Sequence, residues 1–382
     1  MNKIKKFLYA KGLLTNTPYK KIKNIDELLQ LPFESTPNYK RVHHVDLSEL
    51  DLSKEKDMFI GPMLQYISPE KAKELKIVTN WTTDVVWPAT DKLPPDFNPI
   101  NELEVAKEPT DTIKLHKAGK TGKNISIAII DQRLNQQHPE YADNIKYYSV
   151  LGDTWDKDGI DYHGSLVSGC AVGHTTGTAP DADLYYFAAP MIVNGEPNRK
   201  YINEAIRQLL EINKTLPENK KIRFLSCSWG SRTDNGADDS KTLFDECEKN
   251  GIMVIGGAHK SMSDYIPYDK RYKNKTGYIG IPTDGKTTPF WQGGYYYTRQ
   301  GGSSSMFPYI AGILACATQG NELFFTRQNW PDELRNIIKQ TAINSPEHGL
   351  IINPDGIAQK IAQLTKEMDQ QITINKSNQY EQ

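Results

Sequence analysis

From Asn124 to Asn250 the chain alternates short apolar runs with stretches of helical composition, and this alternation constrains the fold more than any other feature. The first run, Ile125–Ile130 (ISIAII), ends at Asp131. Similar apolar runs occupy residues 184–188, 222–227 and 252–256. The helix candidates are residues 164–172, 201–213 and 239–250. Such an alternation is typical of a parallel sheet buried on both faces. The sequence therefore predicts an α/β fold of three layers, with a mostly parallel central sheet between helices.

Two more helices are expected after the sheet. Ser305–Gln319 is small and apolar throughout, which indicates a buried helix with Pro308 in its first turn, where proline is tolerated. Pro331–Thr341 has an amphipathic pattern. Beyond Leu364 the chain is polar, and we expect it to fray.

The first hundred residues have a different composition, rich in Lys, Pro, Asp and Asn, with few periodic runs. The segment Lys92–Pro99 (KLPPDFNP) holds three prolines in eight residues, so it cannot be a regular helix and indicates a linker. A chain of 382 residues is long enough for one large domain plus an extension. We therefore expect an N-terminal extension, a main domain and a polar C-terminal tail, at residues 1–100, 101–365 and 366–382.

Composition excludes several classes of partner. The formal net charge is -1, with 46 basic and 47 acidic residues, which does not favour nucleic acid or a membrane surface. No apolar stretch is long enough to span a bilayer. The four cysteines form neither a disulfide framework nor a zinc-site spacing, so we expect reduced, buried thiols. The basic N-terminus has an apolar run interrupted by Lys11 and no cleavage site, which favours a cytoplasmic location and leaves secretion open.

Three segments carry candidate chemistry. Asp131 ends the first apolar run, His163 begins a helix of small residues, and Ser304 precedes another such helix. A serine hydroxyl is a weak nucleophile at neutral pH, so a neutral imidazole must take its proton. A buried carboxylate then fixes the imidazole tautomer and stabilises the imidazolium. Because helix starts have free N–H groups, the main-chain N–H of Ser304 is a natural donor to a developing oxyanion.

In order and context, these segments resemble the three signatures of the subtilisin-like serine peptidases, the subtilases. The order Asp, His, Ser differs from that of the chymotrypsin and α/β-hydrolase families. The family's H-G-T-H-V-A-G pattern appears as HGSLVSG from His163, and its G-T-S-M-A-x-P pattern as GSSSMFP from Gly302. After Asp131, the usual Thr/Ser-Gly is replaced by Gln132-Arg133, while His138-Pro139 is retained.

Two further stretches agree with this resemblance, which covers roughly residues 105–365. Gly177–Pro180 (GTAP) is similar to the G-V-A-P strand entry of the family, and Leu225–Gly230 (LSCSWG) resembles its N-M-S-L-G segment. Subtilases bind the peptide substrate there as an added strand, a mode that makes little demand on sequence. The resemblance therefore implies a substrate-binding role for Ser228, Trp229 and Gly230.

The resemblance implies a subtilisin-like fold and a serine endopeptidase that works through an acyl-enzyme. Ser304 would be the nucleophile, His163 the general base and acid, and Asp131 the group that orients His163. The partner would be a peptide or protein substrate, without a cofactor. Residues 1–100 would be a prodomain or cap able to inhibit the site.

The pattern departs from the family at two further places. The asparagine that usually completes the oxyanion hole falls on His259, within MVIGGAH, and a histidine can also donate an N–H. The calcium loop that often follows the catalytic histidine corresponds to Ala171–Thr178, which has no carboxylate, so we expect no metal there. His259 and the altered residues after Asp131, Gln132 and Arg133, leave a second interpretation open, a pseudopeptidase that binds peptides or regulates without turnover. An esterase of another fold is disfavoured because no G-x-S-x-G elbow is present.

Overall fold

The computed structural model describes residues 19–29, 40–42, 44–55, 78–152, 162–193, 196–228, 235–256, 259, 265–268, 278–298, 302–346 and 349–380. The chain divides into two compact units. The first comprises residues 1–108, 137–139 and 284–301, and the second comprises residues 109–136, 140–283 and 302–382.

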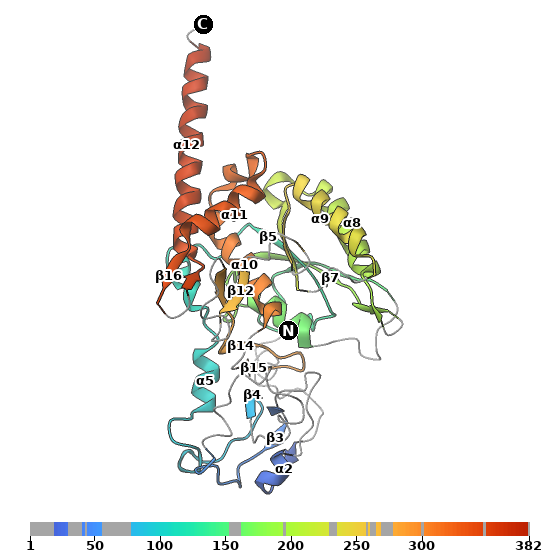
Figure 1. Cartoon of the computed structure of the whole chain (residues 1–382), viewed down its shortest axis with the longest axis vertical. Helices are drawn as coiled ribbons and strands as arrows, with labels where there is room; N and C mark the ends of the chain where they lie inside the picture. Colours follow the sequence, from blue (N-terminus) through green and yellow to red (C-terminus); the bar gives the residue numbers. More distant parts are fainter. Residues whose placement is uncertain are drawn as a thin grey trace. The chain divides into compact units, whose positions relative to one another are not determined.

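A parallel sheet forms the centre of the second unit (Figure 1). Its order is β11-β10-β5-β7-β6, and every neighbouring pair is parallel. The strands are β5 (Ser126–Asp131), β6 (Ile145–Val150), β7 (Asp183–Ala188), β10 (Ile222–Cys227) and β11 (Met253–Gly256). The four apolar runs of the sequence are thus confirmed as strands. The edge strand β6 was not anticipated, because it is mostly half-buried and has no continuous apolar run.

Helices cover both faces of this sheet, which confirms the predicted three-layer α/β architecture (Figure 1). Along β5, Ile127 and Ile129 pack into one core, whereas Ala128 and Ile130 pack into the other. This alternation is the period of two expected of a strand. The first core includes residues of α7 (Tyr162–Val172), α10 (Ser303–Thr318), α11 (Trp330–Thr341) and α12 (Pro354–Tyr380), and the second includes residues of α8 (Lys200–Thr215) and α9 (Ala237–Lys249).

The C-terminal segment differs from the expected frayed tail, because α12 continues to Tyr380. Ile357 and Ile361 anchor its first turns in the core. After Gly356 no glycine or proline interrupts the chain, so its exposed polar turns retain helical geometry.

A smaller sheet of the same unit has the order β12-β13-β17-β16, with strands Tyr265–Tyr268, Ile279–Pro282, Gly349–Ile351 and Ile343–Ser345.

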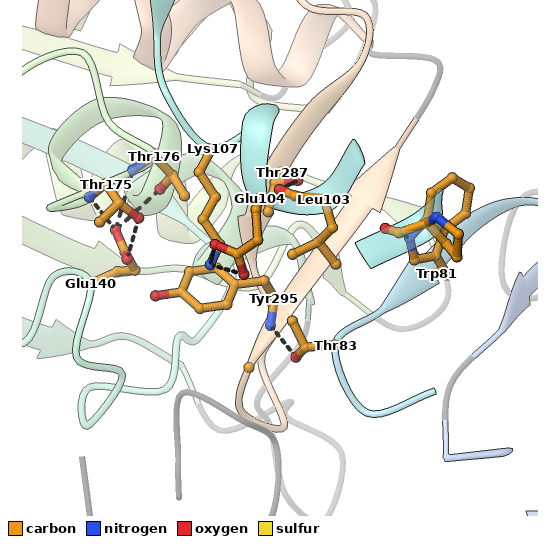
Figure 2. A network of polar contacts seen from close by, with 12 residues as sticks. Trp81, Thr83, Leu103, Glu104, Lys107, Glu140, Thr175, Thr176, Thr287 and Tyr295 are labelled. Carbon is orange, nitrogen blue, oxygen red and sulfur yellow. Dashed lines mark hydrogen bonds and ion pairs between the residues drawn. The ribbon is translucent and has the colours of Figure 1, made fainter. Parts of the chain in front are cut away.

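The first unit has its own sheet, in the order β14-β15-β4-β2. These strands are Lys286–Pro289, Tyr295–Thr298, Val78–Thr82 and Lys40–Val42, and they are accompanied by β1 (Lys20–Lys21), β3 (Val45–Asp46), α2 (Ile25–Leu29) and α5 (Pro99–Val105). The unit therefore combines N-terminal strands with a hairpin from residues 286–298. In Figure 2, Lys107 lies over the Tyr295 ring, 3.8 Å from its centroid, and Thr287 donates to the Leu103 carbonyl at 2.7 Å.

The predicted linker Lys92–Pro99 is irregular, as expected, but it is packed. Phe97 is buried against Trp81, with their ring centroids 5.4 Å apart. Trp81 Nε1 donates to the Pro99 carbonyl at 2.9 Å, and Asn98 caps α5 by accepting from the Asn101 N–H. This segment is thus part of the core of the first unit.

Of the helices in the described ranges, none is both long and apolar enough to cross a membrane.

Candidate active site

Asp131, the last residue of β5, has no solvent-exposed surface. Its Oδ1 accepts from His163 Nδ1 at 2.6 Å and from the Gln132 N–H at 2.8 Å. The short distance to the imidazole is that of a charge-assisted hydrogen bond. Its Oδ2 is also buried and has no hydrogen-bond partner within the described chain. The structure therefore joins two of the three predicted catalytic side chains directly.

His163 is the second residue of α7, and 15% of its side-chain surface is exposed. A carboxylate can only accept, so the contact with Asp131 places the imidazole proton on Nδ1. In this tautomer the Nε2 lone pair is the basic one. That is the state required of a general base toward a hydroxyl.

Gly164 allows the start of α7 to approach the turn after β5. A Cβ at this position would lie 2.5 Å from the Gln132 carbonyl oxygen and 2.6 Å from the Tyr186 hydroxyl. That hydroxyl donates to the same Gln132 carbonyl. Burial, together with the nearby Asp131 carboxylate, raises the pKa of Tyr186 well above its usual value, so the phenol remains a donor. Glycine is therefore needed at position 164 because a side chain there would collide with the Gln132 carbonyl and the Tyr186 hydroxyl, and not because the backbone turns there.

Ser304 is the second residue of α10 and is partly exposed. The helix begins at Ser303, two residues earlier than expected, so Pro308 lies inside it rather than in its first turn. In an α-helix the N–H of residue 308 would bond the carbonyl of Ser304, but proline has no N–H. Ser228 supplies the missing donor, with its hydroxyl 2.7 Å from the Ser304 carbonyl oxygen. The structure therefore brings the end of β10 into contact with the predicted nucleophile segment.

The two helices that carry His163 and Ser304 pack closely against each other. At Gly312 of α10, a Cβ would lie 1.9 Å from the Thr178 hydroxyl and 2.8 Å from the Ala171 carbonyl. The Thr178 hydroxyl also donates to the Tyr309 carbonyl of α10 at 3.0 Å. The small residues of these segments therefore serve helix packing, which holds both helix starts near the carboxyl edge of the sheet.

Two donors were predicted for an oxyanion hole. The Ser304 N–H lies in the first turn of α10, where the N-cap residue Gly302 has no side chain to bond it. The His259 ring is buried and packs edge-to-face against Phe244 of α9, with centroids 6.0 Å apart. Its main-chain N–H donates to the Gly256 carbonyl at 3.0 Å. Of the predicted substrate-binding residues, Trp229 and Gly230 lie outside the described residues.

Sequence reasoning missed Glu140, a buried carboxylate that organises the loop after α7. Its oxygens accept from the Thr175 N–H at 2.8 Å, the Thr175 hydroxyl at 2.7 Å and the Thr176 N–H at 3.3 Å (Figure 2).

Within the described ranges, no three His, Cys, Asp or Glu side chains group together in a way that could hold a metal ion. All four cysteines are buried and free, as predicted.

Comparisons with known proteins agree with the resemblance to subtilases. The model of the subtilase family matches residues 122–274, a range that includes Asp131 and His163 and ends before Ser304. The major intracellular serine protease of Bacillus subtilis (strain 168) is 27% identical over 175 residues. This alignment covers 43% of the present chain and 50% of the relative, so the chain spans about half the length of that curated protein.

Solved structures are similar in fold. The prenylagaramide maturation protease PagA superposes with a TM-score of 0.50 at 16% identity, covering 65% of this chain and 98% of that one. A structure of the subtilase cytotoxin SubAB gives a TM-score of 0.48 at 13% identity, covering 67% and 96%. The family match over residues 122–274 and the curated relative together confirm the resemblance to subtilases.

Proposed function

We propose that this chain is a serine endopeptidase that hydrolyses peptide bonds through an acyl-enzyme. Ser304 is the nucleophile, His163 the general base and acid, and Asp131 the carboxylate that orients His163. The observation that carries the proposal is the 2.6 Å hydrogen bond between His163 Nδ1 and the fully buried Asp131. A buried carboxylate bonded to a partly exposed histidine is the arrangement that nucleophilic catalysis by serine needs.

In the proposed reaction, His163 Nε2 takes the hydroxyl proton of Ser304 as the serine oxygen attacks the scissile carbonyl carbon. The resulting oxyanion accepts from the Ser304 N–H in the first turn of α10. The imidazolium, stabilised by Asp131, then gives its proton to the leaving amine, and the C–N bond breaks. A water molecule, deprotonated by the same imidazole, then attacks the acyl carbon. The bond from this carbon to the Ser304 oxygen breaks, the serine oxygen takes the proton back from the imidazolium, and the carboxyl product leaves.

The substrate is proposed to bind as an extended strand beside the end of β10. Ser228 ends the described part of this segment and is hydrogen-bonded to the Ser304 carbonyl, so a peptide paired there lies next to the nucleophile. Main-chain pairing gives affinity with little dependence on side chains. Ser228, Trp229 and Gly230 are the residues proposed for this role.

Fluorophosphonate labelling of the full chain tests the proposal, because the probe forms a covalent bond only with an activated serine. We expect one adduct, located on Ser304 by peptide mapping of the digested protein. An adduct on another serine would contradict the assignment. A folded chain that binds peptides and takes no label would instead favour the pseudopeptidase.

His259 is proposed as the second oxyanion donor, in the position where subtilases have asparagine. Replacing it with alanine should lower turnover roughly 10²–10³-fold, the usual effect of losing one such donor. His174→Ala, a change of the same kind at an exposed histidine, is the matched control. Steady-state kinetics and thermal unfolding of both variants separate catalysis from folding. Unchanged turnover in the folded His259→Ala variant would restrict the imidazole to packing against Phe244.

A further inference from the structure

A pocket of about 460 Å³ lies in the second unit, at the sheet edge opposite to Asp131. Arg223, near the start of β10, and Gly251, just before β11, line it. Because the strands are parallel, their starting ends lie away from the edge where Asp131 and Ser228 stand. The pocket is therefore separate from the candidate active site, and its volume is that of a small-molecule site.

The lining of this pocket is strongly basic. Its cationic side chains are Lys214, Lys221, Arg223, Lys249 and Arg327, and its acidic one is Glu218. Arg223 is paired with Glu218, and outside the lining Glu211 and Glu333 pair with Lys214 and Arg327. The Lys221 ammonium donates to main-chain carbonyls. Lys249 is exposed, and its ammonium has no ion pair within the described chain.

An indole donor without an acceptor lies in the same wall. Trp330 is 2% exposed, and its Nε1 is buried without a hydrogen-bond partner in the described structure. Gly251 lies beside this nitrogen, and a Cβ at that position would be in contact with Nε1, at 3.4 Å. A buried unpaired donor is unfavourable, and an acceptor from a ligand would satisfy it. Phe325 also lines the pocket, is 7% exposed, and has the Arg223 guanidinium over its ring, 4.6 Å from the centroid.

Helix electrostatics explain part of this charge. Lys214 and Lys249 lie in the last turns of α8 and α9, where a cation is favourable beside free carbonyl groups. Lys221 belongs to the same group, because its ammonium donates to the Asn213 and Lys214 carbonyls in the last turn of α8. The argument does not account for Arg223, at the start of β10, nor for the unpaired indole of Trp330. Cations, a donor and aromatic rings around one cavity are the features of a binding site for an anion with a flat group.

We propose that this pocket binds an organic phosphate, a phosphate group joined to a flat ring. Lys249 and Lys221 attract the phosphate oxygens, the Trp330 indole N–H donates to an acceptor of the ligand, and the ring packs against Phe325. This inference does not depend on the peptidase mechanism, because none of these residues belongs to the proposed triad.

Isothermal titration of the full chain with phenyl phosphate tests the proposal, with phenol and inorganic phosphate as the two halves of the probe. Saturable binding of phenyl phosphate, tighter than that of either half, is expected. Lys249→Gln should weaken it about tenfold, the effect of one lost charge-assisted hydrogen bond. Lys366→Gln, the same change at an exposed lysine of α12, should leave it unaltered.

A second variant, Trp330→Phe, removes the indole donor and keeps an aromatic ring, and its fold is checked by circular dichroism. We expect it also to bind phenyl phosphate several-fold more weakly. If wild type shows no saturable binding, the proposal is overturned. It is equally overturned if Lys249→Gln binds as tightly as wild type.

Discussion

A chain with alanine in place of Ser304 is expected to fold as wild type does and to lose peptide hydrolysis by about 10⁶-fold. The magnitude is that of removing the nucleophile from a triad of this type, after which only binding and the oxyanion donors still assist the reaction. Ser304 is partly exposed, and the carbonyl that Ser228 contacts belongs to the main chain. The change should therefore alter the free energy of unfolding by less than about 0.5 kcal/mol.

Ser303→Ala is the matched control for this prediction. Ser303 is the preceding residue of α10 and is exposed, so the same hydroxyl is removed one position away from the proposed nucleophile. Turnover of a quenched fluorescent peptide and thermal unfolding should be measured on both variants. Ser303→Ala should retain turnover close to that of wild type. Hydrolysis by Ser304→Ala at the wild-type rate would show that another residue carries out the chemistry.

Most strands of the central sheet could be predicted, because the signal for each lies in its own local sequence. Four of the five are buried apolar runs, and burial of both faces of a parallel sheet leaves little ambiguity about them. The first unit was not predictable in the same way. Its strand β15 pairs with β4, with Tyr296 opposite Thr82 and Thr298 opposite Asn80, more than two hundred residues earlier in the chain. No local pattern around residue 296 indicates such a partner, so the hairpin was assigned to the main domain.

The candidate site shows the same division between local and distant information. The sequence motifs pointed to Asp131, His163 and Ser304 as candidates, and each of them stands where an element begins or ends. The role of Pro308 depends on a residue of another segment, Ser228, whose hydroxyl replaces the N–H that proline lacks. Likewise, nothing near Glu140 in the sequence indicates the two threonines that it holds. Tertiary contacts of this kind become visible only in the folded chain.

Asp131→Asn should lower turnover by about 10⁴-fold, the second-largest loss that we expect. The imidazolium that forms during the reaction lies 2.6 Å from the Asp131 oxygen, and a neutral amide cannot stabilise its charge. The amide could also turn its NH₂ group toward His163, which would place the proton on Nε2 and remove the base. Either effect raises the barrier without displacing α7 or α10.

Stability measurements show whether that loss is catalytic. Asp131 is fully buried and one of its carboxylate oxygens has no partner within the described residues, so the charge is costly to hold. We therefore expect the Tm of Asp131→Asn to be at or above that of wild type, while turnover collapses. Asp245→Asn, the same change on the exposed face of α9, should alter neither quantity. If Asp131 had only a structural role, Asp131→Asn would lose stability and activity together. A folded Asp131→Asn variant with wild-type turnover would remove Asp131 from the mechanism.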